Sequence, residues 1–138
     1  MAKTRDEIDA FVAGVLGAPA HRAQGLTIVS IGDGEAVLAF EAGPAALAPH
    51  GGVHGGVLAM LMEPAAVCAL YPLLPPDRMA VTADMHVQNM RPVRAGARVE
   101  IHARVLRVGK SLAFCEASVI DDGKVCTSAR LTKAVVPA

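Results

Sequence analysis

The stretch of residues 51–76 most constrains the fold of this chain, because it holds a single charged side chain. Glu63 is the only Asp, Glu, Lys or Arg within it. Inside this stretch, residues 55–70 begin with a glycine pair and are otherwise apolar on every side of a helical axis. A helix of that kind is buried on most of its faces. The rest of the chain must therefore wrap around a helix roughly 24 Å long, at ~1.5 Å per residue.

The single carboxylate of this helix, Glu63, is the first candidate for a functional residue. A charged group in apolar surroundings costs free energy unless it is paired, solvated in a cleft or protonated. The alternative is a structural carboxylate that a neighbouring hydroxyl or backbone group satisfies. Pro64 follows directly and lacks the N–H that would bond the carbonyl of Met60, so we expect a kink beside Glu63.

Segments with the pattern of β-strands lie on both sides of the expected helix. Before it, residues 26–31 and 35–41 surround a Gly-Asp-Gly turn, which predicts a hairpin. After it, four segments alternate between apolar and polar side chains, and we expect a run of antiparallel hairpins with one covered face. These segments are residues 79–90, 97–108, 111–120 and 124–135.

The length of 138 residues is enough for one sizeable core and too short for two. Residues 4–16 carry apolar side chains at helical spacing, which predicts a short amphipathic helix. We therefore expect a single domain over residues 1–138, with an N-terminal helical flank at 1–24 and a core at 25–136. The expected fold class is α+β, in which a curved antiparallel sheet wraps around a long central helix.

Charge and composition exclude several classes of partner. The chain has 13 Lys and Arg against 13 Asp and Glu, so no broad field favours nucleic acid or an anionic membrane. Residues 57–74 are a marginal candidate for a membrane span, but Glu63 and Pro64 would lie near its middle. With 53% hydrophobic residues, the chain is more apolar than a monomer of this size needs, so we expect a homodimer or homotetramer.

The cysteines and histidines predict neither a disulfide framework nor a metal site. Three cysteines without a C-x-x-C pair fit a reducing cytoplasm, and the first residues lack the plan of a signal peptide. These cysteines are Cys68, Cys115 and Cys126. His50 and His54 together with Glu63 resemble metal ligands only superficially, because the histidines lie on a glycine-rich loop instead of one helical face. We therefore expect no metal.

Three motifs in order carry a resemblance to a known family. The first is His-Gly-Gly at 54–56, with the acidic Glu63 nine positions after the histidine. The second is Thr-Ala-Asp-Met-His-Val-Gln-Asn-Met-Arg-Pro at 82–92, and the third is Gly-Lys-Ser-Leu-Ala-Phe at 109–114. With these motifs, residues 25–136 resemble the hotdog-fold acyl-CoA thioesterases, in particular the phenylacetate-pathway thioesterases and the 4-hydroxybenzoyl-CoA thioesterases that carry a glutamate in the helix.

The resemblance implies hydrolysis of acyl- or aryl-CoA thioesters without a cofactor, since coenzyme A is part of the substrate. By matching position, Glu63 is the catalytic carboxylate, as nucleophile or general base, and the N–H of Gly55 polarises the thioester carbonyl. A donor at a helix start suits that task, because removing one such donor typically costs roughly 3 to 4 kcal/mol. His54 positions this turn, and Thr82 supplies a hydroxyl near the attacking water. The expected substrate-binding residues are Gly56, Leu58, Met62, Arg91, Lys110 and Ser111.

Further basic side chains at strand ends are candidates for contacts with the phosphates of coenzyme A. These are Arg94, Arg107, Arg130 and Lys133. Most such charges are simply solvated. In the resembling family two subunits share each site, which implies that Thr82 reaches Glu63 across a dimer interface, and that the assembly is a dimer or a dimer of dimers.

Two alternatives to hydrolysis stay open. A hotdog-fold acyl-thioester hydratase or dehydratase also pairs a histidine with an acid on the helix. A non-catalytic acyl-CoA-binding module is the second, because Ala48 stands where the family often has an amide side chain and because Pro64 lies beside the acid. The sequence does not specify the acyl group.

Overall fold

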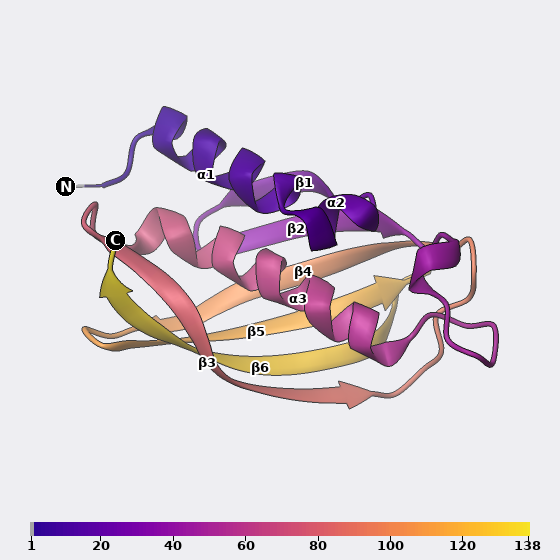
Figure 1. Ribbon diagram of the computed structural model, residues 1–138. Helices are drawn as coiled ribbons and strands as arrows, with labels where there is room; N and C mark the ends of the chain where they lie inside the picture. The colour runs from indigo at the N-terminus through magenta and orange to yellow at the C-terminus, as the bar shows by residue number, and fades with distance from the viewer. Residues whose placement is uncertain (1) are drawn as a thin grey trace.

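The computed structural model describes residues 2–138 and consists of one sheet with two principal helices (Figure 1). The helices are α1 (Arg5–Gly17), α2 (Pro19–Ala23) and α3 (Gly55–Leu70). The strands are β1 (Thr27–Gly32), β2 (Glu35–Glu41), β3 (Arg78–Asn89), β4 (Arg98–Val108), β5 (Leu112–Asp121) and β6 (Lys124–Pro137). Two short 3₁₀ turns, η1 (Pro44–Ala46) and η2 (Tyr71–Leu73), lie in the connections on either side of α3.

The sheet is antiparallel throughout and has the strand order β1-β2-β4-β5-β6-β3. The two expected hairpins β4–β5 and β5–β6 are confirmed. The expected hairpin between β3 and β4 is wrong, because β3 pairs with β6 at the far edge and the chain then crosses to β4 on the other side of β5 and β6. This crossover leaves β3 with one neighbouring strand in the described chain.

Helix α3 lies in the concave face of the sheet, as its composition predicts (Figure 1). Leu61 and Met62 are fully buried there, and alternate residues of the strands cover them from the sheet side. Pro64 lies inside α3 without ending it. The stretch Gly55–Leu73 is long and apolar enough for a membrane span by composition alone, yet 50% of that window is buried in this fold, which is the pattern of a core helix.

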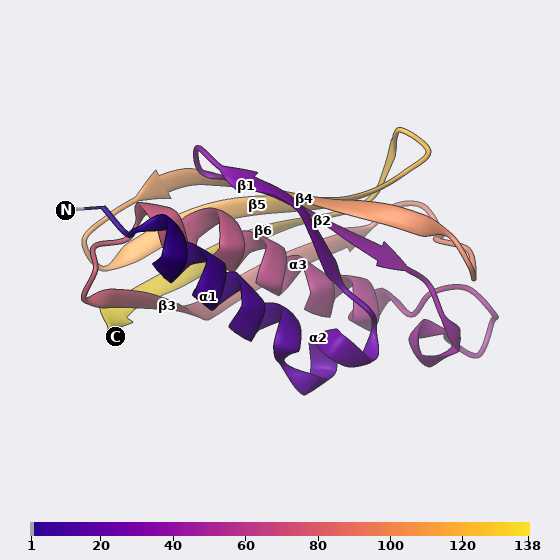
Figure 2. The ribbon, with the colours of Figure 1, turned by 90° about the horizontal axis from the view of Figure 1, so that it is seen from above.

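The N-terminal flank lies over the same helix, as the view from above makes plain (Figure 2). The ring of Phe11 on α1 stacks on Tyr71 just after α3, with 3.7 Å between the ring centroids. Lys3 is buried, its Nζ lies 4.2 Å from the centroid of the Tyr71 ring, and it donates to the carbonyl of Pro76. Thr4 caps the start of α1, and its capping box with Glu7 stabilises that helix. The flank therefore attaches to the C-terminal end of α3.

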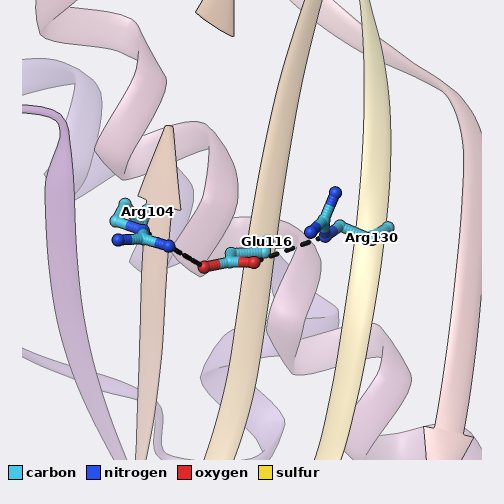
Figure 3. Close-up of polar contacts among 3 residues, drawn as sticks. All are labelled: Arg104, Glu116 and Arg130. Atoms are coloured by element: carbon cyan, nitrogen blue, oxygen red, sulfur yellow. Dashed lines mark hydrogen bonds and ion pairs between the residues drawn. The ribbon is translucent and has the colours of Figure 1, made fainter. Parts of the chain in front are cut away.

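The outer face of the sheet is polar where its central strands meet. Glu116 on β5 lies between two arginines of neighbouring strands and binds Arg104 on β4 and Arg130 on β6 (Figure 3). These pairs are exposed to water, so each contributes little to stability. Arg130 lies mid-strand, which corrects its placement at a strand end, and its guanidinium is engaged by Glu116 on the face away from α3.

Candidate active site

The start of α3 forms a preorganised backbone donor. His54 is the N-cap, and its Nδ1 accepts from the N–H of Gly56 at 2.9 Å. The N–H of Val57 bonds the carbonyl of His54. Within residues 2–138, the N–H of Gly55 forms no hydrogen bond. This arrangement leaves one helix-terminal donor free for an anionic or polarised oxygen, where the helix dipole also favours negative charge.

A cavity of about 390 Å³ opens beside this donor. It is lined by His50, Val53, Gly55, Leu58, Asn89, Met90, Arg91, Pro92 and Val93. Three residues expected from the sequence, Gly55, Leu58 and Arg91, therefore meet in one place, although they come from two motifs far apart in the chain. Met62 is different, because it is fully buried in the core and does not line this cavity.

Glu63 lies eight residues along α3 from Gly55, which places their backbones about 12 Å apart along the axis. The side chain of Glu63 is half-buried. A catalytic carboxylate or its water must come within about 3.5 Å of the thioester carbon. Glu63 does not line the cavity beside Gly55, so one chain presents the carboxylate and the helix-start donor as two separate half-sites.

A second polar cluster surrounds Thr82 on the inner face of the sheet. Lys133 on β6 is 3% exposed, and its Nζ donates to Oγ1 of Thr82 at 2.6 Å. Burial lowers the pKa of Lys133 below its ordinary value of 10.5, while the charges of Glu63 and Cys115 act in the opposite direction. Within one chain, Lys133 is therefore linked to Thr82 by a hydrogen bond and to Glu63 by charge.

Lys133 is a residue that was placed wrongly from the sequence. It was expected to be a strand-end charge toward phosphates, but it alternates with Ala129 and Leu131 on the buried face of β6. The alternation of Lys133 with these apolar residues at every second position can be read from the sequence. Only the pairing of β6 with β3 and β5 shows that this side of the strand is the buried one. Burial also raises the pKa of the Cys115 thiol to about 11, so this neighbouring group stays neutral at pH 7.

The remaining expected substrate-binding residues lie at two different ends of the fold. Gly56 adjoins the cavity at the start of α3, whereas Lys110 and Ser111 form the turn between β4 and β5. Lys110 is exposed, and the carbonyl of Ser111 accepts from the N–H of Val135 near the end of β6. One chain does not bring this turn to Gly55, because β4 begins at the end of the sheet where β3 finishes and runs to the opposite end of the strands (Figure 1).

No group of three or more possible metal-ligating side chains lies together within the described residues 2–138. The two histidines of the loop before α3 each serve a local purpose instead. Nδ1 of His50 accepts from the N–H of Gly52 at 3.1 Å, as Nδ1 of His54 does from Gly56. These contacts fix the loop that leads into the helix start.

We expect Lys133→Met to make the folded state more stable than wild type at neutral pH. In the folded state the pKa of Lys133 is lowered by burial. Between that pKa and 10.5 the unfolded chain binds more protons than the folded chain, so the free energy of unfolding of the wild type rises with pH in this window. The stability gain of the variant should therefore shrink as pH rises toward 10.5. Urea unfolding at a series of pH values measures this, with the exposed Lys124→Met as the control that should give no such trend. A constant difference at all pH values would contradict a buried ammonium.

Comparisons with known proteins agree with this fold. The thioesterase superfamily signature matches residues 50–127, which include the start of α3, Glu63 and the second and third motifs. The chain is 30% identical over 112 residues to a 1,4-dihydroxy-2-naphthoyl-CoA hydrolase of Listeria monocytogenes, covering 80% of this chain and 90% of that protein. It is 31% identical over 112 residues to human acyl-coenzyme A thioesterase 13, covering 78% of each.

The solved structures give the same result. A mutant of the phenylacetic acid degradation protein PaaI from Thermus thermophilus is 32% identical, with a TM-score of 0.77 over 84% of this chain and 97% of that one. The helix wrapped by an antiparallel sheet is thus a hotdog fold of the thioesterase type, as the motifs predicted. This chain belongs to the thioesterase superfamily, whose members include acyl-CoA thioester hydrolases.

Proposed function

We propose that the protein hydrolyses acyl- or aryl-CoA thioesters to the free acid and coenzyme A. The observation that carries this proposal is the unpaired N–H of Gly55 at the start of α3, beside a cavity of about 390 Å³. The same helix carries a single carboxylate, Glu63. Membership of the thioesterase superfamily supports the reaction class. No metal or cofactor is needed, and the three buried free cysteines are in keeping with a reducing cytoplasm.

The chemistry follows from the charges that develop during hydrolysis. The thioester oxygen gains negative charge when the carbonyl carbon is attacked, and the Gly55 N–H stabilises that charge. Glu63 either accepts a proton from the attacking water or attacks directly to give an anhydride that water then cleaves. The C–S bond breaks in either route, and coenzyme A leaves as a thiolate that takes up a proton. His54 acts by holding the turn in place through Gly56.

The separation of the two half-sites argues that a second copy completes each site. Gly55 of one copy would act with Glu63 and Thr82 of the other, which overcomes the distance of about 12 Å along α3. The free edge of β3 carries the exposed apolar residues Met79 and Val81, and antiparallel pairing of two β3 strands would cover them.

Such a pairing also brings the two expected coenzyme A contacts together. It turns the β4–β5 turn of one copy, with Lys110 and Ser111, toward the cavity and Arg91 of the other, where both copies could hold coenzyme A. Two such dimers could form a homotetramer.

Release of free thiol from a panel of short, medium and aromatic acyl-CoA esters tests the proposal. Thiol release is expected from at least one class and would also identify the preferred acyl group. Loss of the ultraviolet absorbance of an enoyl-CoA without thiol release would favour a hydratase instead. Tight binding of the esters without any turnover would favour a non-catalytic acyl-CoA-binding module.

A further inference from the structure

The side chain of Asn89 lies against the start of α3, although Asn89 comes from the last position of β3. A β-carbon added to Gly55 would lie 3.0 Å from Nδ2 of Asn89 and 3.4 Å from its Oδ1. Both residues line the same cavity of about 390 Å³. The carboxamide therefore lies beside the free N–H of Gly55 at the start of α3.

Thr127 fixes which end of this carboxamide is available. Thr127 is fully buried on β6, directly opposite Asn89 in the strand register, and its Oγ1 donates to Oδ1 of Asn89 at 3.1 Å. The carbonyl end is thus held by the protein. The NH₂ end is left beside Gly55 on the cavity side, and an amide NH₂ can only donate.

One oxygen atom can reach both donors. The backbone nitrogen and the β-carbon position of any residue are about 2.5 Å apart, so the N of Gly55 and Nδ2 of Asn89 are at most about 5.5 Å apart. An acceptor that lies about 2.9 Å from each donor spans such a pair. Oxyanion holes commonly combine a backbone N–H with a side-chain amide in this way.

We propose that Asn89 is a catalytic residue that donates, together with the N–H of Gly55, to the thioester oxygen as it becomes an oxyanion. The inference rests on the proposed hydrolysis and adds the second donor to it. Asn89 transfers no proton: its Nδ2–H shortens its bond to the oxygen as charge builds, and relaxes when the carbonyl re-forms and the thiolate leaves. Thr127 is a positioning residue, since it acts on the substrate only through Asn89.

The test compares Asn89→Asp with Asn89→Ala under conditions where wild type releases thiol. Aspartate has the size of asparagine and can still accept from Thr127, but it presents a carboxylate where a donor is needed. We expect kcat to fall about 100-fold in Asn89→Ala and further in Asn89→Asp, with little change in KM. Gln88→Ala, at the neighbouring exposed position of β3, is the matched control and should keep wild-type kcat.

A second comparison separates donation from packing. Thr127→Val keeps the shape of the side chain and removes its O–H, so it should lower kcat in the wild-type background and have no further effect in the Asn89→Ala background. Thermal unfolding of each variant checks that the fold is retained.

Two outcomes contradict the inference in distinguishable ways. Near wild-type kcat in Asn89→Asp, with a loss only in Asn89→Ala, would mean that Asn89 merely fills space and would overturn the catalytic role alone. Absence of thiol release by wild type from every ester in the panel would overturn the proposed hydrolysis and the role of Asn89 with it.

Discussion

Two inactive variants, Glu63→Gln and Gly55→Pro, are expected to regain activity when their subunits are mixed. Each variant lacks one half-site, and a mixed dimer combines Gly55 of the first chain with Glu63 of the second in one intact site. If the subunits mix at random, half of the dimers are mixed, and each mixed dimer has one intact site out of two. About a quarter of wild-type activity should therefore return in the unfractionated mixture. Proline suits this test because it removes the N–H at the first helical position, where its φ is accepted, and because His54 already has the extended backbone that precedes proline. The β-carbon that proline adds lies 3.0 Å from Nδ2 of Asn89, so any crowding falls in the same half-site.

Co-expression of the two variants with different tags, followed by tandem purification, isolates the mixed dimer for the thiol-release assay. This purified dimer should show about half of wild-type activity, since one of its two sites is intact. The control is a mixture of Glu63→Gln with Thr82→Val. Because Thr82 and Glu63 belong to the same half-site, that mixture contains no intact site and should not exceed the mean of its parents. Recovery in the control mixture, or none in the first, would overturn this division of the site.

Glu63→Gln by itself should lower thiol release at least about a hundredfold, a loss near 2.7 kcal/mol of transition-state stabilisation. The amide keeps the size of the side chain but can neither take a proton from water nor attack the carbonyl. Measurement of kcat and KM on the preferred ester tests this, with Glu116→Gln on the outer face of the sheet as the matched substitution that should leave kcat unchanged. Activity within a fewfold of wild type would make Glu63 a structural carboxylate.

The central helix was the most predictable element, and the strand placement was the least. An apolar stretch with one charge has few ways to fold, so helix Gly55–Leu70 is found where the sequence predicts it. The position of β3 depends on pairing with β6, 51 residues away between Thr82 and Lys133, and no local pattern encodes that distance. The expectation of a simple run of hairpins failed for this reason.

The same physical reason explains which site residues could be predicted. Gly55 and Glu63 stand out within a single segment, because a glycine at a helix start and a lone acid are anomalies of local composition. Asn89 and Lys133 matter only through what lies opposite them across the sheet. Asparagine at a strand end and lysine in a strand have ordinary solvated roles in most chains, so only the strand register shows that these two side chains face inward.

A β-bulge in β3 places Thr82 and Asn89, which belong to different half-sites, on the same face of the sheet. Thr82 pairs with Lys133 and Asp84 pairs with Thr132, which leaves Ala83 as an extra residue with no partner across the ladder. In a regular strand, residues seven positions apart point to opposite faces, because side chains alternate with a period of two. The extra residue Ala83 therefore lets Thr82 and Asn89 share the inner face of the sheet. The ladder runs in register on both sides of Ala83, so deletion of this one alanine should give a regular strand in which Thr82 and Asn89, then six positions apart, still face the helix. Substitutions that straighten β3 at its present length would instead turn one of the two side chains to water.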